Sequence, residues 1–144
     1  MGYIESNLLP DEQVVYKARL HWITFWKSCA LIFLGVIFLF IQAIIGGVVV
    51  VIGVFAFLSP LIGYATSEFG VTNKRVIIKV GFLRRKTLEL LLRHVEAISI
   101  DQSVMGRFLN YGSVTLTGTG GVREVFHNVS APLEFRRRIQ GEAS

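Results

Sequence analysis

The stretch that decides the fold runs from residue 28 to residue 67 and reads SCALIFLGVIFLFIQAIIGGVVVVIGVFAFLSPLIGYATS. It contains 40 consecutive residues without an Asp, Glu, Lys or Arg side chain. A single helix of that length would measure roughly 60 Å, whereas the hydrocarbon core of a bilayer is only about 30 Å thick. One straight crossing is therefore excluded, and the chain must fold back on itself.

The adjacent glycines Gly46-Gly47 are the natural place for the turn. We predict apolar helices at about 23–45 and 48–65, because lipid requires every backbone polar group to be bonded within its own segment. The result is a transmembrane helical hairpin over residues 22–66. Three further glycines are candidates for close helix approach: Gly35, Gly53 and Gly63.

Aromatic and basic residues at the ends of this hairpin predict its orientation. Trp22, Trp26 and Lys27 precede the first helix, and Tyr64 closes the second. Aromatic rings favour the membrane interface, and basic residues favour the cytoplasmic side. We therefore expect these four residues to be interface anchors of a multi-pass protein with both termini in the cytoplasm.

Charge is confined to the two flanks of the apolar run. The whole chain has 144 residues, of which 17% are charged, against about 25% in average soluble domains. Residues 1–27 are neutral, and residues 68–144 carry the entire net charge of +5. The single cysteine, Cys29, excludes an intramolecular disulfide. The apolar run is too long for a secretory signal and is read as retained.

Residues 67–144 change to short alternating runs separated by glycine turns, which is typical of an antiparallel β-barrel or sandwich. Ser130 and Pro132 predict the start of a C-terminal helix at about 131–140. In the N-terminal arm, residues 1–21, the segment 13–20 reads as a strand that would join the same sheet. The predicted fold class is an α+β membrane protein.

Several short motifs resemble those of the bacterial pleckstrin-homology (PH) membrane proteins of the YdbS-like type. They are Leu9-Pro10-Asp11-Glu12, His21-Trp22, Thr72-Asn73-Lys74-Arg75, Gly81 with Arg84-Arg85, and the stretch from Asp101 to Val114. The resemblance covers nearly the whole chain. It implies a bent antiparallel sheet with a capping C-terminal helix, in a bacterial inner membrane, and it implies no agreed activity.

A basic hairpin is the candidate contact site. It surrounds Gly81 and consists of Lys79, Phe82, Arg84, Arg85 and Lys86. Basic residues near an anionic membrane surface attract its headgroups, but positive charge after a span also fixes topology by itself. A specific acidic partner is the third interpretation. The resemblance does not transfer the phosphoinositide ligand of eukaryotic relatives.

The sequence offers no sign of catalysis, and we expect no enzyme, no cofactor and no metal site. His21, His94 and His127 lie far apart and lack the spacing of metal ligands. Gly118 to Gly121 reads as a hairpin turn rather than a phosphate loop. Nucleic-acid binding is disfavoured, since Phe108, Tyr111 and Phe126 occur in core-like contexts.

These observations favour a non-catalytic, membrane-anchored PH-like module that mediates protein assembly or anionic-lipid contact at the cytoplasmic face. The expected partners are membrane lipids and a second copy or another membrane protein. The alternative is a small channel or transporter subunit built from oligomerised hairpins. No ionisable residue lies at the centre of the predicted membrane spans, which weakens that alternative.

Overall fold

The computed structural model describes residues 2–81 and 84–143, which fall into two compact units. The hairpin unit is Trp22–Ala65, and the sheet unit combines Met1–His21 with Thr66–Ser144. The sheet unit is thus assembled from two segments of chain that the hairpin separates.

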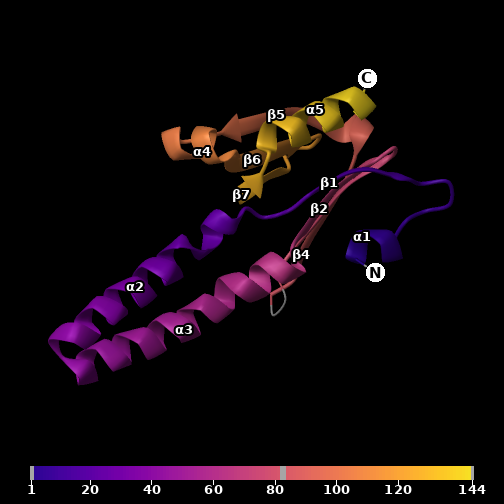
Figure 1. Cartoon of the computed structure of the whole chain (residues 1–144). Coiled ribbons are helices and arrows are strands. Elements are labelled where there is room, and N and C mark those ends of the chain that lie inside the picture. The colour runs from indigo at the N-terminus through magenta and orange to yellow at the C-terminus, as the bar shows by residue number, and fades with distance from the viewer. Residues whose placement is uncertain (1, 82–83, 144) are drawn as a thin grey trace. The chain divides into compact units, whose positions relative to one another are not determined.

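The hairpin unit consists of η1 (Trp22–Phe25), α2 (Trp26–Ile41) and α3 (Ala43–Thr66). Figure 1 shows α2 and α3 as two long helices joined by a tight turn. The spans Trp22–Ile41 and Ala43–Thr66 are long and apolar enough to cross a membrane by length and composition. Their mean hydropathies are 2.1 and 2.5.

The turn between the helices lies at Gln42 and not at Gly46-Gly47 as predicted. Gln42 alone leaves the helical conformation, with φ −149° and ψ 112°, and α3 begins at the next residue. Gly46 is part of α3, and a Cβ there would collide with the backbone of Leu39 in α2. This glycine therefore permits the last turn of α2 and the first turn of α3 to pack together instead of forming the bend.

Two other glycines let the helices approach closely. A Cβ on Gly35 would lie 2.8 Å from the backbone nitrogen of Val50, and one on Gly53 would lie 2.7 Å from the side chain of Ile32. The hydroxyl of Ser28 donates to the carbonyl of Ala56 at 3.1 Å across the same interface. Gly63, also predicted to be a close-approach position, faces open space.

The sheet unit contains two antiparallel sheets. The first has the order β1 (Val14–Ala18), β2 (Glu68–Thr72), β3 (Arg75–Val80), β4 (Lys86–Leu91). The second has the order β5 (Val95–Asp101), β6 (Tyr111–Gly118), β7 (Arg123–Ser130). The shorter elements are α1 (Tyr3–Ser6), η2 (Leu92–His94) and α4 (Val104–Leu109). The unit ends in α5 (Pro132–Ala143).

Among the described residues the strands do not close into a barrel, so the barrel form of the prediction is wrong. The chain passes from β4 to β5 through η2, which changes its direction, and these strands belong to different sheets. At the other side, Leu20 forms a single bridge with Val129 of β7. The residues after β1 therefore reach the second sheet.

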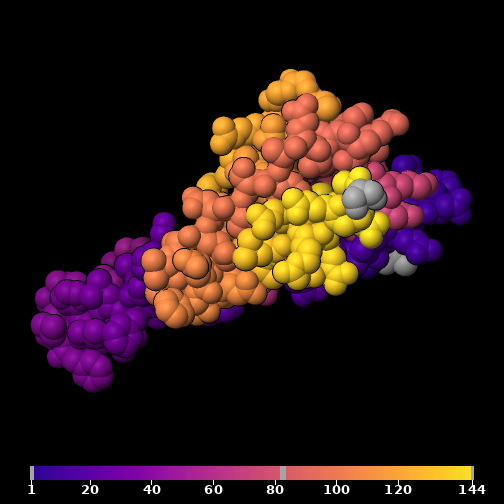
Figure 2. Space-filling view, turned by 90° about the horizontal axis from the view of Figure 1, so that it is seen from above, coloured from indigo at the N-terminus to yellow at the C-terminus, as the bar shows by residue number. Residues whose placement is uncertain are grey.

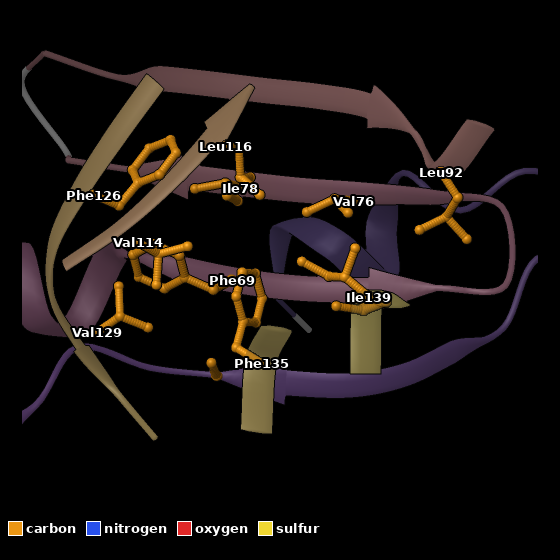
Figure 3. Close-up of a cluster of buried hydrophobic side chains, with 12 residues drawn as sticks. Phe69, Val76, Ile78, Leu92, Val114, Leu116, Phe126, Val129, Phe135 and Ile139 are labelled. Carbon is orange, nitrogen blue, oxygen red and sulfur yellow. The ribbon is translucent and has the colours of Figure 1, made fainter. Parts of the chain in front are cut away.

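The core lies between the two sheets and α5 (Figure 3). Phe69 on β2 meets Phe126 on β7 and Phe135 on α5 in edge-to-face geometry, with ring centroids 5.8 and 6.4 Å apart. The other buried members are Ala18, Val71, Val76, Ile78, Leu92, Val114, Leu116, Val129 and Ile139. Burial of this apolar area from three layers is the main force that holds the unit together.

Candidate functional site

The predicted basic hairpin is the connection between β3 and β4. Val80 pairs with Lys86, and the turn lies between them. Gly81 has a positive φ of 86°, and a Cβ there would lie 2.5 Å from the carbonyl oxygen of Arg84. Glycine is thus required at this position, both for its left-handed conformation and for the close backbone approach.

The strand register places this turn at a particular end of the sheet. Lys79 is the partner of Glu68, the first residue of β2, and α3 ends at Thr66. Chain continuity therefore puts the basic turn at the end of the sheet where the chain leaves the second apolar helix. This holds whatever the angle between the two units.

Two of the predicted cations share one aromatic ring. The ammonium of Lys79 lies 5.6 Å, and the guanidinium of Arg85 5.5 Å, from the ring centroid of Tyr3 in α1. The carboxylate of Glu68 accepts hydrogen bonds from the backbone amides of Tyr3 and Ile4 at 3.0 and 3.1 Å. The N-terminal helix is thereby fixed beside the basic turn and holds both cations near it.

The remaining candidates are in different situations. Lys86 forms an ion pair with Glu124 of β7 and lies over the ring of Phe126, so it joins the two sheets. Arg84 is exposed and forms no ion pair within residues 2–81 and 84–143. Phe82 lies outside the described residues. The turn therefore presents Arg84, with Lys79 and Arg85 beside it, while Lys86 has a structural contact.

The sequence analysis missed a buried ionic cluster. The Glu12 side chain is completely buried, and its carboxylate accepts from Arg75 Nε at 2.9 Å and Nη2 at 3.1 Å. It also accepts from the hydroxyl of Thr72 and the amide of Leu9, each at 2.7 Å. Arg75 donates in addition to the carbonyl of Asn7 at 2.7 Å. This cluster fastens the N-terminal arm to the β2–β3 turn.

Opposing effects act on the pKa of Glu12. Burial of the carboxyl raises the pKa, but the hydrogen bonds from Arg75, Leu9 and Thr72 together outweigh burial and bring it below the ordinary value of 4.5. Glu12 is therefore ionised at neutral pH. No signal in a single sequence pairs residues 12 and 75, although both belong to the short motifs on which the family resemblance rests.

A second unpredicted feature is the surface of α4. Val104, Met105 and Phe108 are 72%, 57% and 81% exposed, so the core-like environment predicted for Phe108 is wrong. Phe126 is buried as predicted. In Figure 2 the orange segment that contains α4 lies at the surface beside the yellow C-terminal segment. The apolar residue types alone could not distinguish these two phenylalanines.

His21 links the arm to the region after α4. Its ring is buried and lies 5.0 Å from the ring of Tyr111, and its amide donates to the carbonyl of Asn128 at 2.7 Å. Burial lowers the pKa of His21 below 6.5, and a hydrogen bond with the backbone of Leu109 partly opposes that shift. The imidazole is therefore neutral at pH 7.

The predicted interface anchors lie at the open end of the hairpin unit. Trp22, Trp26 and Lys27 are exposed, and Tyr64 packs 5.4 Å from the ring of Phe25. Within the described ranges no three His, Cys, Asp or Glu side chains are grouped so as to hold a metal ion.

Comparison with known families identifies a match over most of the chain. The sequence model of the family described as bacterial PH domain matches residues 29–143, which includes most of both units. A search of curated proteins and a search of solved structures each found no match.

Proposed function

The chain belongs to the bacterial PH domain family, and from this membership we propose that it is a membrane-anchored binding module rather than an enzyme. In this proposal the hairpin unit crosses the cytoplasmic membrane of a bacterium twice. The sheet unit lies at the cytoplasmic face, where it contacts anionic lipid and assembles with other membrane protein. The YdbS-like type remains part of the proposal.

The lengths and surfaces of the two helices support the membrane location. Spans of 20 and 24 residues correspond to roughly 30 and 36 Å, which matches the hydrocarbon core. Only 11% of each apolar window is buried within the chain. Large apolar side chains on the remaining surface require a lipid or protein environment.

The observation that carries lipid contact is the pairing of Glu68 with Lys79. Because β2 follows α3 directly, this register puts the basic β3–β4 turn at the end of the sheet next to α3 in the chain. In this proposal that end is the one nearest the membrane. Each Lys or Arg near an anionic surface contributes about 1 kcal/mol. Arg84 and Arg85 are the residues that we assign to headgroup contact, with Lys79 beside them.

A groove on α3 supports assembly through the hairpin. Its lining residues are Ala43, Ile44, Gly47, Val48, Val51 and Ile52, and it has a volume of about 460 Å³. Apart from its chain neighbours and the nearby backbone of α3, no atom of the described residues lies within 4 Å of a Cβ at Gly47, which leaves space for another helix. The lining is mainly apolar, which favours helix packing over the water-filled path of a channel.

The lipid assignment is tested with the full chain in a mild detergent. Native mass spectrometry would compare retention of phosphatidylglycerol with retention of phosphatidylcholine at low salt. Replacing Arg84→Gln and Arg85→Gln together should reduce the preference for phosphatidylglycerol by about 30-fold, since two contributions of about 1 kcal/mol are lost.

The matched control is Arg136→Gln with Arg137→Gln, which removes the same charge from α5. This control should keep the preference. If both variants lose the preference equally, the preference depends on net charge and not on the basic turn. An unchanged preference in the first variant would contradict the assignment of headgroup contact to Arg84 and Arg85.

A further inference from the structure

The helix α4 displays the most exposed apolar side chains of the described sheet unit: Val104, Met105 and Phe108. At 3.6 residues per turn these three positions fall within an arc of about 100°. The only charged residue of α4 is Arg107, which flanks this arc. The surface of α4 is therefore an apolar face with one adjacent cation.

The backbone around α4 fixes this orientation. Ser103 caps the helix by accepting from the amide of Gly106 at 3.0 Å, and Asn110 ends it in the left-handed conformation. Gly106 is buried, and a Cβ there would lie 2.6 Å from the carbonyl oxygen of Tyr111. Gly106 must therefore face the sheet unit, so the apolar residues on the opposite side face outward.

Contacts within the sheet unit hold the end of α4 near His21, the residue that precedes the hairpin unit. The ring of His21 packs on Tyr111, which lies two residues after α4. Trp22, the first residue of the hairpin unit, follows His21, and its Cα is about 3.8 Å away along the chain. The end of α4 thus lies within a short distance of the point where the chain would enter a bilayer.

We propose that the apolar face of α4 inserts into the lipid interface as a second, apolar membrane contact of the sheet unit. This inference rests on the proposed function, because it takes the hairpin unit to be in the bilayer. Val104, Met105 and Phe108 enter the boundary between headgroups and acyl chains, and Arg107 remains at the phosphates. Together with the basic turn, α4 holds the sheet unit at two points.

Lipid fits this face better than a protein partner does. A stable protein interface uses about 20–30 residues on each side, whereas the exposed face of α4 has three apolar side chains. Interfacial helices bury an apolar face by only about 5–10 Å, a depth that three such side chains can fill. A flanking arginine matches the anionic surface.

The test uses the full chain in nanodiscs of phosphatidylethanolamine and phosphatidylglycerol. Cys29 is the only cysteine, so Cys29→Ser gives a background for single labels. Nitroxide labels are attached through Met105→Cys or Phe108→Cys on α4, Arg137→Cys on α5 and Phe33→Cys in α2. Power saturation with oxygen and a nickel chelate then measures the depth of each label.

The proposal expects the α4 labels about 5–10 Å into the boundary, the α5 label in water and the α2 label in the hydrocarbon core. Adding Phe108→Asp should return the Met105 label to water, whereas Leu133→Asp on α5 should not. If the α4 label is in water while the α2 label is in lipid, the inference about α4 is overturned and the proposed function is not. Shielding of α4 from both reagents indicates a protein or second copy and also overturns the inference. A water-exposed α2 label contradicts the proposed function itself.

Discussion

The hairpin unit and the sheet unit bury opposite kinds of residue. In α2 and α3 the buried positions are Ser28, Gly35, Gly46 and Gly53, while Phe33, Phe40 and Phe55 are exposed. In the sheet unit most of the buried side-chain volume is large and apolar, and most charged residues apart from Glu12 and Arg75 lie at the surface. The two units therefore differ in where their apolar surface lies, on the outside of the hairpin unit and in the core of the sheet unit.

The difference also appears in how each unit treats polar groups. A side-chain hydrogen bond from Ser28 to the carbonyl of Ala56 links the two helices of the hairpin. The sheet unit buries an ionic cluster around Glu12 and Arg75. Packing of small residues should therefore dominate the stability of the hairpin, and core burial with buried ionic contacts should dominate the stability of the sheet unit.

The largest expected effect is on the ionic cluster. Arg75→Met leaves the Glu12 carboxylate buried without its partner and should destabilise the sheet unit by about 3–5 kcal/mol. Hydrogen exchange of peptides from β2 and β3 would measure the loss. The double variant Glu12→Leu with Arg75→Met should recover much of it, because no uncompensated charge remains. Equal instability of both variants would contradict this account.

The next largest effect is on packing of the hairpin. Gly35→Leu should force the helices apart and cost about 1–3 kcal/mol, since its Cβ meets the backbone of Val50. Both tryptophans belong to this unit, so tryptophan fluorescence during titration with sodium dodecyl sulfate reports its unfolding. Gly63→Leu is the matched control, because that position also faces open space and does not line the groove on α3. Similar shifts in the two variants would remove the distinction between the glycines.

The smallest effect concerns pH and the sheet unit alone. The pKa of His21 is below 6.5 in the folded state, so the unfolded chain binds its proton first as pH falls. Stability is complete above pH 6.5 and decreases as pH falls below that value. Thermal unfolding at pH 7.5 and 5.5, followed through the circular dichroism of the β-strands, should show this decrease.

The variant His21→Phe should show a smaller change in stability between pH 7.5 and 5.5, because the group that titrates there is removed. Glu12 acts in a lower range, since its stabilising ionisation is lost only as pH falls below 4.5. An unchanged slope in the variant would mean that another group titrates there.

Local sequence patterns predict most of the elements of the sheet unit but few of its distant contacts. Strands β2 to β7 all lie within residues 67–144, where the alternating runs are predicted, because alternation and glycine turns are local properties. The ion pair between Lys86 and Glu124 and the cluster of Glu12 with Arg75 join residues far apart in sequence. No local pattern contains that information.

The errors in the hairpin and in α4 have a shared physical cause. Glycine at 46 is needed for contact between helices, yet in the sequence it looks the same as a glycine needed for a bend. Phe108 and Phe126 are the same residue type, but only one has a layer of protein over it. Residue identity limits the possible roles, and tertiary contact selects among them.

The pairing of β1 with β2 has a consequence for how the protein is made. Val14–Ala18 and Glu68–Thr72 are neighbours in one sheet, with all of Trp22–Ala65 between them in the chain. If the hairpin crosses the bilayer twice, both strands emerge on one side and can pair. If only one helix crosses during synthesis, β1 and β2 lie on opposite sides of the membrane and the sheet cannot form. Under the proposed function, folding of the sheet unit would therefore serve as a check on correct insertion, and a misinserted chain would expose unpaired strands to cellular proteases.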